Sequence, residues 1–138
     1  MDNKTLYSVE ENLQLGLLDF ALKTIGTQDK IPDEFLNNER IKKAAARGIG
    51  MHLLDSRGDG DIETAMKIRD LFHIPNEMVR EDSLQGIENW TGDKGSEFGR
   101  KICLAFDIPP DFMESEIIQN AKRRYEHLHA EHEQQIKK

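Results

Sequence analysis

Apolar residues recur along the chain at spacings of three and four, the period of an amphipathic helix, and three segments share one apolar pattern. Each segment begins with Ile-Pro, and apolar residues follow at offsets four, five, ten and thirteen from the isoleucine. The three isoleucines are Ile31, Ile74 and Ile108. The stretches AMKIRDLF from Ala65 and GRKICLAF from Gly99, which precede the second and third copies, also match. The pattern predicts repeated helical units.

Proline is favoured in the first turn of a helix, so each Ile-Pro pair predicts that a first helix of its unit begins at Pro32, Pro75 or Pro109. The residue before a proline is disfavoured in the helical region, so the three isoleucines should end the preceding segment in an extended turn and pack on the core. We therefore expect an all-α fold without a sheet. It should be a short stack of helical hairpins, with five to six helices and a long C-terminal helix.

We expect a single domain over residues 1–138, with units that start near residues 31, 74 and 108. Residues 1–30 form an incomplete preceding unit, in which LGLLDFALKTIG from Leu15 is a second helix that ends at Gly26. This pattern resembles the helical-hairpin repeats of α-solenoid proteins, in which stacked hairpins bury each other's apolar faces. It lacks the signature of tetratricopeptide repeats, so the resemblance implies a fold and no particular function. The alternative is a helical bundle in which Ile-Pro recurs by chance.

Composition and charge limit the classes of partner that we expect. Charged residues make up 33% of the chain and the net charge is −7, which disfavours indiscriminate binding to nucleic acid or to an anionic membrane. No apolar run approaches the roughly 18 residues of a membrane span, and the N-terminus lacks the features of a signal peptide, so we expect a cytoplasmic protein. The single cysteine, Cys103, should be a buried thiol. We expect no cofactor.

The stretch DSRGDGDIETAM, from Asp55 to Met66, looks like the calcium-binding loop of an EF-hand. Asp55, Asp59 and Gly60 fit positions one, five and six of such a loop. However, Arg57 replaces a ligand at position three, and Met66 removes the bidentate carboxylate at position twelve. The sequence therefore does not favour a metal site in this loop. The weak candidates for metal ligands are Asp55, Asp59 and Asp61.

A capped turn is the alternative interpretation of the same loop. Gly58 and Gly60 would supply positive φ angles, and Asp61 would be the N-cap of a helix that starts at Ile62. The next unit has a similar loop, TGDKGSEF, in which Ser96 is the expected cap. Capping explains both loops, so we prefer it.

The terminal helix carries a second set of metal candidates. His129 and His132 are three residues apart and share a helix face, as would suit a metal or a partner contact, although histidine and glutamate pairs at this spacing are also ordinary helix stabilisers. Apolar residues from Ile118 to Leu128 follow heptad spacing in the same helix. That stripe should pack on the last hairpin or pair with another chain.

Two groups of residues are candidates for contact with a partner. Trp90 would anchor a protein partner if it is exposed, because tryptophan is enriched in binding hot spots, and the alternative places it in the core between units. Basic residues cluster toward the later parts of corresponding first helices, where a stack would align them along one edge. These basic candidates are Lys42, Lys43, Arg47, Arg123 and Arg124.

Taken together, these patterns favour a small helical-repeat interaction or adaptor protein that binds another protein. It would be a monomer or a homodimer through its C-terminal helix. Nucleic-acid binding through the basic edge is one alternative, and a calcium-responsive helix-loop-helix protein is another. No catalytic residue is identified, because the sequence shows neither a nucleophile-base grouping nor a phosphate-binding loop. An enzymatic role is therefore not favoured, although scattered residues can also build a catalytic site.

Overall fold

The structure is a computed structural model that describes residues 2–137, with side chains described as far as Ala130. The described residues form eight α-helices and two 3₁₀ helices without a strand, which confirms the all-α class. The expected number of five to six helices was too low, because α1 and the short turns after the prolines add elements. The elements are α1 (Asn3–Gln14), α2 (Leu18–Ile25), α3 (Asp33–Leu36), α4 (Glu39–Leu54), α5 (Ile62–Phe72), η1 (Asn76–Val79), α6 (Arg80–Lys94), α7 (Ser96–Ala105), η2 (Pro110–Glu114) and α8 (Glu116–Lys137).

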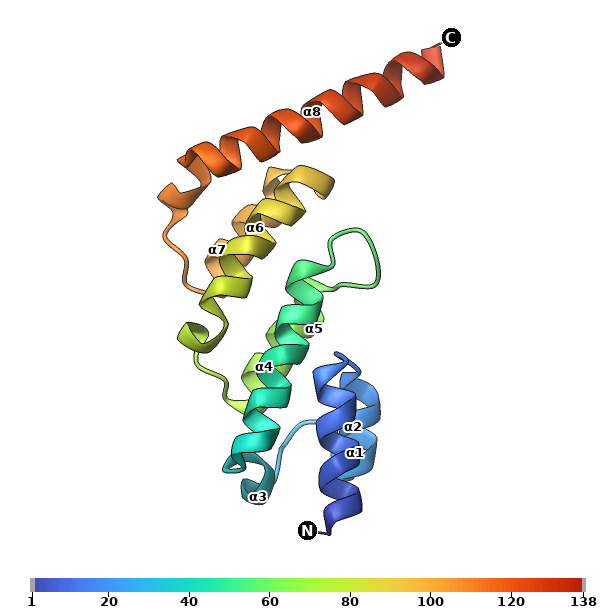
Figure 1. Ribbon diagram of the computed structural model, residues 1–138, viewed down its shortest axis with the longest axis vertical. Helices are drawn as coiled ribbons and strands as arrows, with labels where there is room; N and C mark the ends of the chain where they lie inside the picture. Colours follow the sequence, from blue (N-terminus) through green and yellow to red (C-terminus); the bar gives the residue numbers. More distant parts are fainter. Residues whose placement is uncertain (1, 138) are drawn as a thin grey trace.

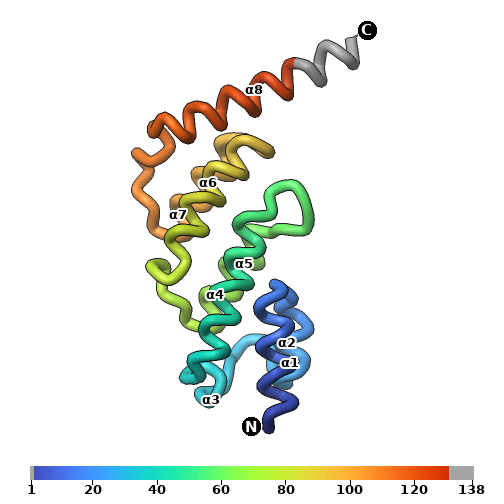
Figure 2. Tube along the Cα trace, in the orientation of Figure 1, coloured from blue at the N-terminus to red at the C-terminus, as the bar shows by residue number. Residues whose placement is uncertain are grey.

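The helices form two layers along an elongated molecule (Figure 1). In the front layer α1 packs on α4, α4 on α6, and α6 on α8. Behind them, α2 packs on α1, α5 on α4, and α7 on α6. The trace in Figure 2 follows this order from one end of the molecule to the other. The front layer is continuous, whereas in the back layer neither α2 and α5 nor α5 and α7 are closely packed on each other.

Pro32, Pro75 and Pro109 each open a short helical turn, and a longer helix begins several residues later. Pro32, Pro75 and Pro109 are the N-caps of α3, η1 and η2, while α4, α6 and α8 begin at Glu39, Arg80 and Glu116. Asn38 explains one of these delays, because its side chain accepts hydrogen bonds from the backbone N–H groups of residues 40 and 41 and so caps α4. The prediction was right about a helical turn at each proline and wrong about the start of the long helices.

The residues that surround Ile-Pro follow the predicted burial only in part. All three isoleucines, Ile31, Ile74 and Ile108, are buried as expected. At offset thirteen all three residues are buried, but at offset four Met78 is 44% exposed. The second copy also differs in its backbone, because α6 follows η1 without a break, whereas two asparagines separate α3 from α4.

One apolar core runs through the interior of both layers. The matched stretches before the second and third Ile-Pro contribute equivalent residues, since Ile68 and Ile102 are both fully buried and Phe72 and Phe106 nearly so. No helix in the described part of the chain has the length and apolar character needed to cross a membrane. Further large side chains that are fully buried are Leu13, Ile41, Ile49, Leu53, Ile87 and Ile118.

Glycine allows the front-layer helices to approach each other closely. A methyl group on Gly48 of α4 would meet the carbonyl oxygen of Leu13 in α1. A methyl group on Gly86 of α6 would lie 2.8 Å from the carbonyl oxygen of Leu53 in α4. In both cases the obstacle is backbone, which cannot rotate away as a side chain can. These two glycines therefore set the spacing between successive helices of the front layer.

Candidate functional site

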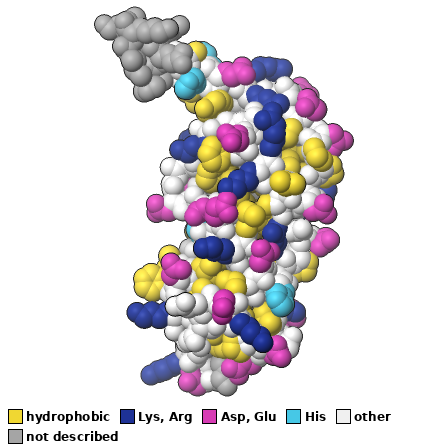
Figure 3. Space-filling model, turned by 180° about the vertical axis from the view of Figure 1, so that it is seen from behind, with side chains coloured by type: hydrophobic (Ala, Val, Ile, Leu, Met, Phe, Trp, Pro, Cys, Tyr) yellow, Lys and Arg dark blue, Asp and Glu magenta, His cyan; other side chains and the backbone are white. Residues whose placement is uncertain are grey.

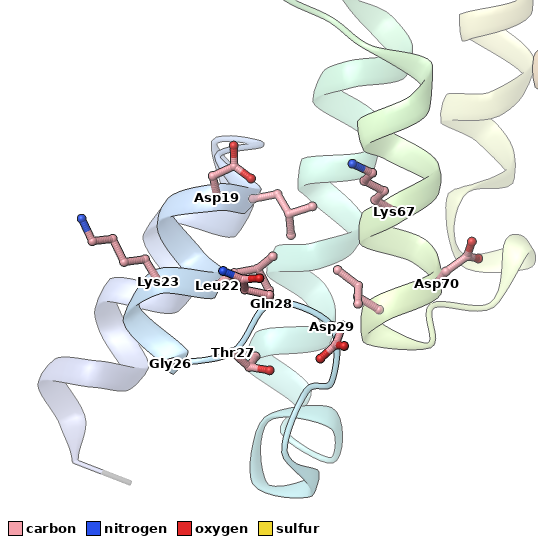
Figure 4. A pocket seen from close by; sticks show the side chains of 11 residues that line it. Asp19, Leu22, Lys23, Gly26, Thr27, Gln28, Asp29, Lys67 and Asp70 are labelled. Carbon is pink, nitrogen blue, oxygen red and sulfur yellow. The ribbon is translucent and has the colours of Figure 1, made fainter.

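A groove of about 1010 Å³ lies between α2 and α5 of the back layer (Figure 4). Its floor is apolar, because Leu18, Leu22 and Leu71 line it. Charged residues stand around the floor: Asp19 and Lys67 toward one end and Asp29 toward the other, while Lys23 points away from α5. The remaining lining residues are Gly26, Thr27, Gln28 and Asp70.

The groove exists because the connection after α2 is longer than its counterparts. Each back-layer helix is followed by a residue in the left-handed region: Gly26 after α2, His73 after α5 and Asp107 after α7. His73 and Asp107 are followed directly by Ile-Pro, which leads the chain at once into η1 and η2, respectively. Four residues, Thr27–Lys30, separate Gly26 from its Ile-Pro, and three of them line the groove. The extra residues form part of the wall between α2 and α5.

The corresponding place between α5 and α7 is occupied by side chains of the protein itself. The guanidinium of Arg69 lies 4.8 Å from the centre of the Phe106 ring, and its Nη1 donates a hydrogen bond to the carbonyl oxygen of Ala105. Lys101 of α7 also forms an ion pair with Glu63 of α5. The groove that remains there measures about 440 Å³.

Nothing equivalent closes the groove between α2 and α5. Leu22 takes the place of Arg69, since each lies four residues before the left-handed residue that follows its helix. Among the described residues, no hydrogen bond or ion pair joins α2 to α5. Leu22 and Leu71 are half-buried, so part of each side chain remains in water. Seen from behind, the molecule carries apolar patches between charged side chains (Figure 3).

The loop that resembles an EF-hand is held by its own hydrogen bonds. The two carboxylate oxygens of Asp55 accept the backbone N–H groups of Gly58 and Asp59, each at 2.9 Å. Asp61 is the N-cap of α5, as expected, and its Oδ1 accepts the N–H of Glu63 at 3.0 Å. These oxygens are therefore engaged within the loop, and they act as turn and cap groups.

Contacts with α6 also fix this loop. Ser56 Oγ donates a hydrogen bond to Asp93 Oδ2 at 2.5 Å, and Arg57 Nε donates to Asp93 Oδ1 at 3.2 Å. Ser56 is buried, although it lies in a loop. Arg57 thus has an acidic partner on the neighbouring helix and does not turn toward the other carboxylates of the loop. The contacts dock the loop onto the front layer.

Two details of the predicted capping were wrong. Gly58 and Gly60 do not have positive φ angles. They are needed for space, because a methyl group on Gly58 would lie 2.6 Å from the Asp55 carboxylate, and one on Gly60 would meet the Asp55 backbone carbonyl. Ser96 does not cap α7, since it is the first residue of that helix, and Gly95 precedes it with a φ of +114°. Gly95 makes that sharp entry because a residue with a side chain rarely adopts this φ.

The remaining metal candidates do not come together in the described part of the chain, where no three histidine, cysteine, aspartate or glutamate side chains are grouped as metal ligands would be. The candidates that are not grouped in this way are Asp55, Asp59, Asp61 and His129. The ring of His129 stacks on that of Tyr125, with 5.8 Å between the ring centres. The side chain of His132 lies outside the described residues.

Trp90 is a core residue and not an exposed anchor. Only 7% of it is exposed, its ring stacks on Phe98 at a centroid distance of 5.5 Å, and its Nε1 donates a hydrogen bond to the carbonyl oxygen of Leu53 at 2.9 Å. That carbonyl is in the last turn of α4, where backbone acceptors have no partner within the helix. Trp90 therefore joins α6 to the end of α4, as the alternative interpretation expected, and it is unavailable to a partner.

The basic candidates lie on two helices that α6 separates. Lys43 and Arg47 are exposed on α4, whereas Arg123 and Arg124 are exposed on α8. Lys42 is half-buried, and its Nζ lies 3.7 Å from Oε1 of Glu39. Between the two groups stands α6, which packs on both α4 and α8. A continuous basic edge is therefore not formed by these residues.

Burial raises the pKa values of two side chains, Asp82 and Cys103. Partial burial of Asp82 on α6, with a smaller effect of the Glu81 charge, raises the pKa of the Asp82 carboxyl above its usual value. Cys103 is buried, as expected, and burial raises the pKa of its thiol. A thiol with a raised pKa is a poor nucleophile, which agrees with a packing role.

The apolar stripe of α8 changes from buried to exposed along the helix. Ile118 and Ala121 are buried, as they would be if the stripe packs on the last hairpin, and α8 packs on α6. Leu128 is 50% exposed. The stripe is therefore covered by the protein itself only over its first part, and pairing with another chain stays a prediction.

The groove between α2 and α5 was not among the sequence-based candidates. Its signal was present as a departure from the repeat, since four residues stand between Gly26 and Ile31 where the other copies have none. The sequence pattern assigns the apolar residues of α2 only to a helix that ends at Gly26. Comparison of the chain with protein-family models, curated proteins and solved structures found no match.

Proposed function

We propose that this chain is a protein-interaction module built as a short stack of helical hairpins, and that it binds another protein in the groove between α2 and α5. One observation carries the proposal. The groove is open and apolar at the place where Arg69 fills the equivalent groove between α5 and α7. Stacked hairpins present such grooves between successive second helices, and an apolar groove with polar ends suits a protein segment.

The apolar surface that a partner could bury in the groove is consistent with a moderate affinity. Full burial of a leucine side chain is worth about 1.5–3 kcal/mol, and only a minor part of Leu22 and Leu71 is exposed, so covering that part would contribute at most about 1 kcal/mol each. Loss of either contact would therefore weaken binding by at most about fivefold, because 1.4 kcal/mol corresponds to a factor of ten. The charged residues at the groove ends would add specificity more than affinity.

The two alternative functions have less support. Nucleic-acid binding needs adjacent cations, but α6 stands between the basic residues of α4 and those of α8. A calcium response needs free carboxylates in the loop, but Asp55 accepts two backbone N–H groups and Arg57 is paired with Asp93. We therefore treat both as outcomes of the test.

The test is affinity capture from a lysate of the source cells with three versions of the tagged protein. Leu22→Glu puts a charge in the groove, and Leu104→Glu is its matched control, because Leu104 is 88% exposed on α7 outside the groove. Circular dichroism should show that all three fold alike. We expect Leu104→Glu to retain the partners of the unaltered chain and Leu22→Glu to lose them.

Parallel samples treated with nuclease or with a calcium chelator separate the alternatives. Partners that survive both treatments and depend on Leu22 support the proposal. If Leu22→Glu captures the same set as the control, the groove is not the binding site. Loss of partners under nuclease would favour the nucleic-acid alternative, and loss under chelation would favour the calcium alternative.

A further inference from the structure

The two ends of the groove differ in electrostatic character. Helices α2 and α5 run in the same direction, so their C-terminal ends, near Gly26 and Asp70, lie at the same end of the groove (Figure 4). The C-terminal end of a helix carries a partial negative charge, and Asp29 adds a full charge there. Asp19 and Lys67 at the other end have opposite charges and nearly cancel. One end of the groove is therefore negative and the other close to neutral.

The neighbouring groove shows what this position accepts. Between α5 and α7, the cation of Arg69 covers the Phe106 ring and donates a hydrogen bond to the Ala105 carbonyl. Ala105 and Phe106 are the two residues before the left-handed residue that follows α7. The two residues in the same place on α5 are Leu71 and Phe72. In their groove the chain supplies Leu22 where the neighbouring groove has an arginine, so this acceptor position receives no cation from α2.

We propose that the occupant of the groove is an amphipathic protein segment whose apolar side chains cover Leu22 and Leu71, with an arginine or lysine next to them at the Asp29 end. This inference rests on the proposed function and specifies the partner. The apolar side chains supply most of the affinity by burial. The cation sets the direction in which the segment binds. A positive charge is stabilised at the end of the groove that holds Asp29 and both helix C-termini, and it is not stabilised at the end that holds Lys67.

A random peptide library displayed on phage, selected on the unaltered protein and depleted on the Leu22→Glu variant, tests the inference. We expect the enriched peptides to contain two or three apolar residues with an arginine or lysine adjacent to them. A synthetic peptide of the most enriched sequence is then titrated by fluorescence anisotropy. Asp29→Asn should weaken its binding about two- to fivefold, since an exposed charge contributes up to about 1 kcal/mol. Asp29→Lys should weaken it further.

Asp111→Asn is the matched control, because Asp111 is an exposed aspartate outside the groove and should leave the affinity unchanged. Enriched peptides that depend on Leu22 but lack a basic residue, or that bind Asp29→Lys as well as the unaltered protein, would overturn this inference and leave the proposed function standing. A selection that yields no peptide dependent on Leu22 would overturn both.

Discussion

Replacing Gly48 by alanine tests how closely the front-layer helices must approach each other. The added methyl group would meet the carbonyl oxygen of Leu13 at the crossing of α1 and α4. Leu13 is itself fully buried, so α1 cannot move away without opening the core. Gly50, two residues further along α4, is the matched control. A methyl group there would meet only the Asp82 carboxylate, the end of a flexible side chain that can rotate.

The difference between the two variants isolates the backbone contact. Alanine in place of a helical glycine favours the helix by about 1 kcal/mol, and this gain is common to both positions. Overpacking a well-packed interior costs about 1–3 kcal/mol, and this cost applies only at Gly48. We therefore expect Gly50→Ala to stabilise the protein by up to about 1 kcal/mol. We expect the free energy of unfolding of Gly48→Ala to be about 2 kcal/mol lower than that of Gly50→Ala.

Both variants are measured by urea unfolding, with far-UV circular dichroism as the signal, and by thermal unfolding. For a chain of 138 residues, an unfolding entropy of about 2.1 cal/mol/K per residue makes 2 kcal/mol equal to about 7 °C in Tm. Fluorescence of Trp90, which lies in the core between α4 and α6, provides a second probe of the same transition. Equal stability of the two variants would refute the close approach of α1 and α4.

Three other substitutions or conditions test further parts of the structure. Trp90→Phe keeps the aromatic stack but removes the hydrogen bond to the Leu53 carbonyl, so the free energy of unfolding in urea should fall by about 1–2 kcal/mol, and an unchanged value would contradict the bond. Burial raises the pKa of the Asp82 carboxyl, so the folded state binds its proton more tightly than the unfolded state does. The protein therefore loses stability as the pH rises from the unfolded-state pKa of 3.8 through the raised pKa of the folded state. Asp82→Asn should therefore raise Tm at neutral pH, by an amount that shrinks toward acidic pH, and a pH-independent effect would argue against burial as the cause. Because Asp55 is occupied by backbone N–H groups, Tm should be the same in calcium and in chelator, and a calcium-dependent rise would show that the loop binds the ion.

Much of the local structure could be predicted because it depends on neighbours in the chain. Gly26 ends α2 in the left-handed region and Asp61 caps α5, as expected, since each interaction spans only a few residues. The buried isoleucines before the prolines and the buried Cys103 follow from apolar periodicity. The predictions for Ser96 and for the φ angles of Gly58 and Gly60 failed, because several backbone solutions fit the same short sequence.

The candidate site was much less predictable. Trp90 and the basic residues stood out by residue type, but the fold buries the first and separates the others. The groove residues Leu22 and Leu71 are ordinary leucines, and they lie 49 positions apart in the sequence. What makes them a candidate site is that they line a groove between α2 and α5 in which no side chain corresponds to Arg69.

The sequence by itself determined the all-α class, the turn at each Ile-Pro and a few helix ends, such as those at Gly26 and Asp61. Hydrogen bonds and side-chain periods that extend over one or two helical turns are enough for these. Only the tertiary structure decided the docking of the loop on Asp93, the glycine contact between α1 and α4, and the open groove. Each of these depends on the distance between helices. That distance is set by the packing of the whole core, in which residues far apart in the chain take part at once.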